Sequence, residues 1–406
     1  MRRTPPISNR LQRILCLDDF EAAARKQLPR PIFGYVSGAA ETNASLSDNR
    51  RAFGEFGFVP RVLVDISKGS PQTSLFGEAY AAPFGIAPMG ISALYAYRGD
   101  LVLARAAAAA RIPMIMSGSS LIRLEDVARE CGGTWFQAYL PGDVREITAL
   151  VERVALAGFR TLVVTVDSQV APNRENYLRA GFSAPLRPTL RLAWDGLTRP
   201  RWLFGTFVRT LFRHGMPHFE NNFATRGAPI LSPSVVREWS ERGRLDWTHF
   251  ALIRRLWKGT LVVKGVLDPD DARMAREAGA DGIIVSNHGG RQLDGAVSPL
   301  RVLPAIVAAC PGIPVMMDSG IRRGTDVLKA LALGAKFVFV GRPFAYAAAV
   351  GGAAGVDRAI TLLSDEIQRD MAMLGISRLS ELGTHRLFRF NDTERAALSP
   401  PANPAR

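Results

Sequence analysis

Residues 260–290 read TLVVKGVLDPDDARMAREAGADGIIVSNHGG, and this stretch indicates the fold class. It begins with a short apolar run, passes through a loop and a helical pattern that opens at Asp268, and ends in a second apolar run from Asp281. Continuous apolar runs joined by a helix are typical of neighbouring strands in a parallel sheet whose faces are covered by helices.

The same unit recurs along the chain, which contains eight such runs. The other six are FGIAPMG from Phe84, PMIMSG from Pro113, TWFQAY from Thr134, TLVVTVD from Thr161, IPVMMDSG from Ile313 and KFVFVGR from Lys336. Helical patterns that open at or next to a capping residue cover Asp100–Ala110, Asp143–Ala157, Asp268–Ala278 and Thr325–Leu333. Eight β/α units favour an α/β fold of the closed (β/α)8 (TIM) barrel type over an open sheet.

Three segments fall outside this repeat. Residues 1–80 precede the barrel and are predicted to form an N-terminal helical cap with a small hairpin. About ninety residues separate the fourth and fifth runs, far more than a usual connection, so we expect a long insertion after the fourth strand, over 180–230. Within this gap Ser234–Lys258 is predicted to be helical. The (β/α)8 barrel region would then span 81–375, and 376–406 would be a C-terminal extension.

The composition limits the class of protein. The formal net charge of +14 suggests an anionic partner, which could be a nucleic acid, a membrane surface or an acidic substrate. The spacing of Cys16, Cys131 and Cys310 fits neither a zinc site nor a disulfide framework, so we expect no metal and a reduced, cytoplasmic setting. Met1–Pro6 is basic without a following apolar region, and no run is long enough to span a bilayer.

The apolar runs end in chemically distinct polar residues. In a barrel of this type the active site lies at the C-terminal face. A single polar residue at a strand end is ordinary, but a ring on nearly every strand favours function. The ring comprises Ser117, Gln137, Tyr139, Thr165, Asp167, Lys264, Asn287, His288, Asp318, Gly341 and Arg342.

The motif SNHGGRQLDG, residues 286–295, carries the strongest chemical signal. His288 can take a proton near neutral pH, and Arg291 can bind a carboxylate through a bidentate fork. The alternative is a solvent-exposed loop whose histidine has no catalytic role. Asp167 could pair with His288 and stabilise its imidazolium, although a capping role for this aspartate is equally compatible with the sequence.

A second constellation combines DSGIRRG, residues 318–324, with Gly341 and Arg342. Loops after the seventh and eighth strands of such barrels commonly bind phosphate, through glycine amides, a helix N-terminus and arginine. The alternative is a glycine-rich turn with surface arginines. Lys264 ends an otherwise apolar run, which favours a lysine that points into a polar site over one at the surface.

These motifs resemble the FMN-dependent L-2-hydroxy acid dehydrogenases and oxidases, a family that includes glycolate oxidase, quinone- or cytochrome-linked L-lactate dehydrogenase and mandelate dehydrogenase. The resemblance extends from Phe33 to about Leu374. It implies that His288 is the catalytic base and Asp167 its partner. The substrate-binding residues that it implies are Tyr35, Tyr139, Arg174 and Arg291. The FMN-binding residues that it implies are Ala87, Pro88, Met89, Gly90, Ser117, Gln137, Thr165, Lys264, Ser286, Asp318, Gly320, Arg322, Gly341 and Arg342.

The chain departs from the family pattern after Arg174. Residues 176–178 read Asn-Tyr-Leu where the usual pattern has an acidic residue, and Gln169 and Pro172 are also unusual. Gly90, where many family oxidases have alanine, favours the dehydrogenase branch.

The resemblance implies oxidation of a small L-2-hydroxy acid, with lactate favoured, and electron transfer to a quinone or cytochrome. The alternative is a soluble oxidase that uses oxygen and releases hydrogen peroxide. A nucleic-acid-binding barrel is disfavoured because no such motif is present. We expect a homo-oligomer, a tetramer. Thr198–Gly215 interleaves basic and aromatic residues, which favours peripheral attachment to the anionic inner membrane over a lid packed on the barrel.

Overall fold

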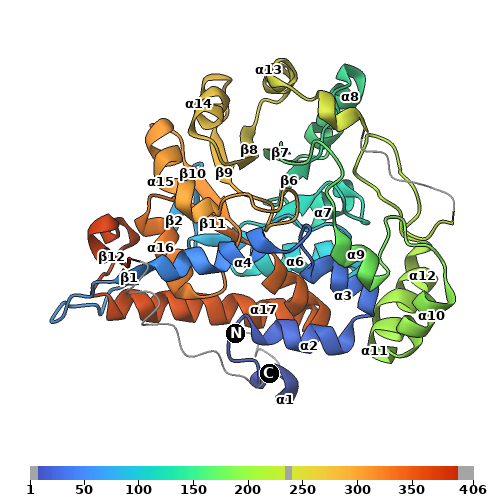
Figure 1. Ribbon diagram of the computed structural model, residues 1–406, viewed down its shortest axis with the longest axis horizontal. Helices are drawn as coiled ribbons and strands as arrows, with labels where there is room; N and C mark the ends of the chain where they lie inside the picture. The colour runs from blue at the N-terminus through green and yellow to red at the C-terminus, as the bar shows by residue number, and fades with distance from the viewer. Residues whose placement is uncertain (1–7, 234–239, 392–406) are drawn as a thin grey trace.

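The computed structural model describes residues 8–233 and 240–391 (Figure 1). Its central sheet has eight parallel strands in the order β4-β11-β10-β9-β8-β7-β6-β5. A parallel bridge between Ile86 and Met114 joins β4 to the start of β5, which closes the sheet. The predicted (β/α)8 barrel is therefore confirmed. The strands are β4 Phe84–Ile86, β5 Ile115–Ser117, β6 Trp135–Ala138, β7 Thr161–Thr165, β8 Thr260–Val266, β9 Gly282–Val285, β10 Val315–Asp318 and β11 Phe337–Val340.

Helices surround the barrel, and the helices predicted over Asp100–Ala110, Asp143–Ala157, Asp268–Ala278 and Thr325–Leu333 begin within one residue of the predicted positions. Asp143 accepts hydrogen bonds from the main-chain N–H groups of Arg145 and Glu146, and Asp268 caps its helix in the same way. The outer helices are α5 Ser92–Tyr95, α6 Gly99–Ala109, α7 Leu124–Glu130, α8 Val144–Leu156, α13 Trp247–Leu256, α14 Pro269–Glu277, α15 Pro299–Ala309, α16 Gly324–Ala332 and α17 Arg342–Met373, which is kinked at Gly352.

Large side chains fill the barrel interior, and a hairpin closes its N-terminal end. Trp135, Phe337 and Phe339 form the centre of this inner core. The hairpin consists of β2 (Thr73–Leu75) and β3 (Glu78–Tyr80), as the sequence predicts for this region, and its turn residue Phe76 packs against Trp135 with ring centroids 5.6 Å apart. The interior is therefore solid, and only the opposite, C-terminal end is available for a site.

The N-terminal helices lie across the barrel beside α17 (Figure 1). Asn49 and Asn287 exchange side-chain hydrogen bonds of 2.8 and 2.7 Å, which attach α4 to the loop after β9. The short strand β1 (Phe56–Phe58) pairs with β12 (Leu387–Arg389). The remaining segments here are α1 Asn9–Gln12, α2 Asp19–Gln27, α3 Arg30–Ser37, α4 Ala44–Arg51, η1 Ala52–Glu55, η4 Leu379–Glu381 and η5 Thr384–Arg386.

The insertion after β7 is largely helical and gathers at one edge of the molecule, beside α3 (Figure 1). It contains α9 Glu175–Ala180, α10 Leu190–Leu197, α11 Pro200–Trp202, the π-helical turn η2 Leu203–Val208 and α12 Arg209–His214. The expected helix over 234–258 is wrong in its extent. Residues 234–239 lie outside the described ranges, η3 (Ser240–Arg244) is 3-10, and α13 starts only after Asp246, whose carboxylate caps it.

Candidate active site

A cavity of about 460 Å³ opens at the C-terminal face of the barrel. Its volume is in the range usual for small-molecule and cofactor sites. Fifteen of the residues singled out in the sequence line it, namely Tyr35, Ala87, Pro88, Met89, Gly90, Tyr139, Arg174, Lys264, His288, Arg291, Asp318, Gly320, Arg322, Gly341 and Arg342. Five more, Ser117, Gln137, Thr165, Asp167 and Ser286, are not part of its wall.

His288 lies in the loop after β9. Its Nδ1 is 2.8 Å from Asp167 Oδ1, just after β7, and its Nε2 is 3.2 Å from the hydroxyl of Tyr139, just after β6. An ionised carboxylate can only accept, so Nδ1 carries the proton and the imidazole lone pair is on Nε2. Nε2 is therefore the atom that can take up a proton from a ligand.

The electrostatics of this pair favour a neutral imidazole. Burial lowers the pKa of His288 below 6.5, although the charge of Asp167 acts in the opposite direction. Burial alone would raise the pKa of Asp167, but His288 and Lys264 together bring it below 3.8. At neutral pH the pair thus consists of a proton acceptor and a carboxylate that orients it.

A lysine ammonium is buried at the end of β8. Lys264 Nζ lies 2.9 Å from Ser286 Oγ and 3.2 Å from Asp318 Oδ2. Burial acts to lower the pKa of Lys264, but Asp318 and Asp167 outweigh it and raise that pKa above 10.5. The cation is therefore permanent, and it can stabilise negative charge on a group bound in the cavity.

Two half-buried guanidiniums lie in the same cavity. Arg174 donates from Nε to the carbonyl of Arg291 at 3.0 Å and from Nη2 to Gln292 Oε1 at 2.7 Å. Arg291 donates from Nη1 to the carbonyls of Tyr35 and Gly38, both at 2.9 Å. Within 8–233 and 240–391 neither guanidinium has a carboxylate partner. The pair is suited to a carboxylate supplied by a ligand.

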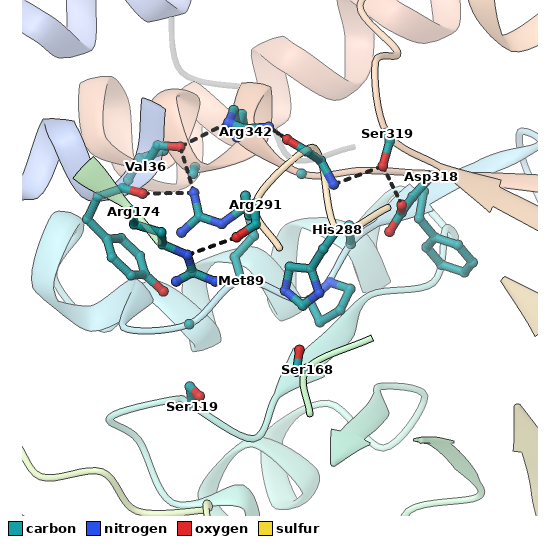
Figure 2. A pocket seen from close by; sticks show the side chains of 18 of the residues that line it. Val36, Met89, Ser119, Ser168, Arg174, His288, Arg291, Asp318, Ser319 and Arg342 are labelled. Atoms are coloured by element: carbon teal, nitrogen blue, oxygen red, sulfur yellow. Dashed lines mark hydrogen bonds between the residues drawn. The ribbon is translucent and has the colours of Figure 1, made fainter. Parts of the chain in front are cut away.

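A further arginine lies at the N-terminus of α17, and Figure 2 shows it beside Arg291, with Asp318 and Ser319 on the other side of His288. Arg342 donates to three main-chain carbonyls at 2.9–3.0 Å. Burial and the charge of Arg291 lower the pKa of Arg342 to about 9. A cation disfavoured in this way is stabilised by an anion, and the helix N-terminus adds to the attraction.

Two buried polar atoms indicate a ligand beside Lys264. Among the described residues, Gln137 Nε2 and Thr165 Oγ1 are buried without a hydrogen-bond partner. Ser117 Oγ donates to Gln137 Oε1 at 3.2 Å, so the amide nitrogen Nε2 is the atom of this side chain that has no hydrogen-bond partner. Thr165 is paired in register with Lys264, which lines the cavity. Unpaired buried groups are rare in folded proteins, so a polar, planar ligand with an anionic tail, such as FMN, fits these residues.

Some cavity residues escaped the sequence reasoning. Ser319 lies directly after Asp318 and has a left-handed φ of 81°, which nothing in its identity would suggest. Tyr177 was visible only as a departure from the family pattern. Others include Ser119, Ser168, Ala171, Phe182 and Ala184, small or apolar residues of loops that carry no chemical signal of their own.

Comparison with known proteins identifies the family. Residues 24–389 match the model of the FMN-dependent dehydrogenases. The chain is 40% identical over 393 residues to L-lactate dehydrogenase of Xanthomonas campestris pv. campestris (strain B100), covering 95% of this chain and 100% of that protein. It is 38% identical over 373 residues to (S)-mandelate dehydrogenase of Pseudomonas putida, covering 91% and 93%. The chain belongs to the FMN-dependent dehydrogenase family, and its cofactor is FMN.

Solved structures agree with this assignment. A crystal structure described as that of the monotopic membrane protein (S)-mandelate dehydrogenase has a TM-score of 0.84 and 37% identity, covering 93% of this chain and 100% of that one. A mandelate oxidase variant with 2-hydroxy-phenylacetamide has a TM-score of 0.76 and 35% identity, covering 92% and 98%. Both dehydrogenases and oxidases thus share this fold, so the fold alone does not select an acceptor.

Proposed function

We propose that this protein oxidises a small L-2-hydroxy acid, with L-lactate as the first candidate, to the 2-oxo acid. The observation that carries the proposal is the imidazole of His288, oriented by Asp167 so that its Nε2 lone pair faces the hydroxyl of Tyr139, in a cavity that also holds Arg174 and Arg291. A proton acceptor and a carboxylate-binding pair are the two protein groups that this oxidation requires.

In the proposed reaction the substrate carboxylate binds Arg174 and Arg291, with help from Tyr35. Tyr139 hydrogen-bonds the substrate hydroxyl. His288 takes the hydroxyl proton at Nε2, and Asp167 stabilises the imidazolium that forms. The same residues allow His288 to take the α-proton instead.

When bound, FMN would supply the oxidant that takes up the two electrons lost by the substrate, together with the α-hydrogen as hydride when His288 holds the hydroxyl proton. We assign its ring to the main chain of 87–90 and to Ser117, Gln137 and Thr165, and we assign Lys264 to the ring edge where negative charge collects. The residues assigned to the ribityl chain and phosphate are Ser286, Asp318, Gly320, Arg322, Gly341 and Arg342.

A substrate panel tests this proposal. The purified protein would be mixed anaerobically with L-lactate, (S)-mandelate, glycolate or a longer 2-hydroxy acid, and loss of flavin absorbance would be followed. We expect L-lactate to act fastest and the D-enantiomers to be inactive. If (S)-mandelate bleaches the flavin fastest, mandelate replaces lactate as the proposed substrate, which the (S)-mandelate dehydrogenase relative would support. No bleaching by any of them would contradict the function.

A quinone or a cytochrome is the proposed electron acceptor, and oxygen with release of hydrogen peroxide is the alternative. The exposed apolar side chains of the insertion support a membrane-bound acceptor. Trp194 is 67%, Phe204 65% and Phe212 87% exposed. We therefore propose that the insertion attaches the protein to the anionic surface of the inner membrane. Turnover with a quinone analogue in the absence of oxygen, compared with turnover in oxygen alone, separates the two acceptors.

A further inference from the structure

Tyr177, on α9, lies between the two guanidiniums of the proposed carboxylate site. Its hydroxyl oxygen accepts hydrogen bonds from Arg174 Nη1, at 3.1 Å, and from Arg291 Nη2. The guanidinium carbons lie 5.1 and 5.6 Å from the centre of its ring. One phenol oxygen therefore fixes the separation of the two cations.

The phenol O–H of Tyr177 remains available. A phenol can accept hydrogen bonds at its oxygen and donate one through its O–H. The oxygen accepts from both arginines, and in the described ranges no residue accepts the O–H. The ring is fixed by Tyr35 and Phe182, with centroids 5.4 and 5.1 Å away, and the residue lines the cavity. A bound ligand can therefore receive this hydrogen bond.

The arginines also keep donors for a ligand. A guanidinium has five N–H groups. Arg174 uses one each on Arg291, Tyr177 and Gln292. Arg291 directs both N–H groups of Nη1 at main-chain carbonyls and one of Nη2 at Tyr177. Five minus three leaves two N–H groups on each arginine, so a carboxylate can bind without displacing Tyr177.

We propose that Tyr177 is a further substrate-binding group of this chain, one whose oxygen holds Arg174 and Arg291 in position while its O–H donates to the substrate carboxylate. The inference rests on the proposed function, because it requires a carboxylate substrate in this cavity. An acidic residue at this position would pair with the arginines and offset their charge. The neutral phenol leaves both charges to the substrate.

Tyr177→Phe removes the hydroxyl and keeps the ring. We expect the Kd of the 2-oxo acid product, measured from the change it causes in the flavin spectrum, to rise about tenfold or more, because one hydrogen bond to a charged group is lost. KM should rise in parallel, while the rate at saturation and the FMN content stay close to those of the wild type. Tyr97→Phe is the matched control, since this hydroxyl lies 3.0 Å from His214 and outside the cavity wall, and it should change neither constant.

The methyl ester of the same 2-hydroxy acid separates substrate binding from a structural effect. It lacks the carboxylate charge, so wild type and Tyr177→Phe should be reduced by it at similar rates. An equal loss for acid and ester, or an unchanged Kd, overturns the role of Tyr177 alone. If no 2-hydroxy acid bleaches the wild-type flavin, the proposed function fails and this inference fails with it.

Discussion

At the scale of single residues, the site depends on the orientation of one imidazole. Asp167 fixes Nδ1, and Ser286 Oγ accepts the main-chain N–H of His288 at 2.9 Å. His288 itself has a left-handed φ of 58°, a conformation that is unfavourable for a residue with a side chain and that is found preferentially at functional sites. The surrounding structure thus holds a strained residue in place so that Nε2 faces the ligand.

His288→Ala should keep FMN and lose reduction by substrate. Removal of a general base costs on the order of a hundredfold or more in the step that it serves. Stopped-flow measurement of flavin bleaching at saturating substrate tests this, with FMN content from the visible spectrum as the control for folding. Bleaching at the wild-type rate would assign the base to another residue.

The pH dependence follows from the same imidazole. A base acts only when deprotonated, so kcat/KM should fall as the pH falls through the pKa of His288 in the free enzyme. Because burial lowers this pKa below 6.5, the half-maximal point of the acid limb should lie below pH 6.5. A half-maximal point clearly above that value would show that another group controls the limb.

Substitution of the two arginines by lysine tests their hydrogen-bonding geometry separately from their charge. Arg291→Lys keeps the charge and loses the fork, so KM should rise by at least tenfold, and Arg174→Lys should behave similarly. Arg191→Lys, on the exposed surface of α10, is the matched control and should leave KM unchanged. An unchanged KM in both site variants would contradict the carboxylate assignment.

Much of the site could be predicted at this scale, because the residues with reactive or charged side chains follow the strands, where a barrel of this type has its active site. A histidine and a lysine near strand ends, with arginines in the loops that follow, are conspicuous beside apolar strands. The reciprocal Asn49–Asn287 pair and the left-handed Ser319 could not be predicted, because each depends on a contact between segments that are distant in sequence.

At the scale of elements, α4 is held by close backbone contacts against the end of the cavity that we assign to the FMN phosphate. A Cβ atom on Gly320 would lie 2.2 Å from the carbonyl oxygen of Asn49, and the φ of Gly320 is +85°. Glycine at this position therefore permits both the turn after β10 and the approach of the helix.

Gly320→Ala should displace α4 and lower the FMN content and the thermal midpoint of the purified protein. Gly312→Ala isolates the backbone effect, since its φ is +89° and nothing lies within 4 Å of the added carbon. It should cost only the conformational strain, about 1–2 kcal/mol, and retain FMN. Equal losses in the two variants would show that the contact with Asn49 is unimportant. FMN content and a denaturant titration supply both measurements.

The elements themselves were predictable to different degrees. Continuous apolar runs and aspartate caps predict the strands and outer helices. A strand that is buried on both faces of a parallel sheet appears in the sequence as a continuous apolar run. The insertion was not predictable in its path. Trp202 is buried and donates to the carbonyl of Leu94 at 2.7 Å, whereas Phe204 and Phe212 are exposed, and only tertiary packing separates these aromatics.

At the scale of the whole molecule, one segment carries exposed arginines and exposed aromatic side chains together: α10–α12 hold Arg201, Arg209 and Arg213 with Trp194, Phe204 and Phe212. Figure 1 shows α10–α12 at one edge, next to α3 and α9. No helix of the described residues is long and apolar enough to cross a bilayer. The attachment that we propose is interfacial, with aromatics at headgroup depth and arginines against anionic lipid. The expected homo-oligomer stays a prediction.

The membrane proposal is tested by sedimentation with liposomes. The full chain and a variant with Thr198–Gly215 replaced by a short Gly/Ser linker would each be spun with anionic vesicles at low and high salt. Each basic residue near such a surface contributes about 1 kcal/mol, so the arginines of this segment together should bring the full chain into the pellet at low salt and release part of it at high salt. The linker variant should stay in the supernatant.

A milder variant, Phe204→Ser with Phe212→Ser, removes two exposed side chains and leaves the buried Trp202 in place, so it should weaken binding without changing FMN content. Some aromatic side chains of this segment are buried and others are exposed. The membrane proposal therefore requires that only the exposed ones contribute to binding. A full chain that stays in the supernatant at low salt would contradict attachment and strengthen the case for oxygen as the acceptor.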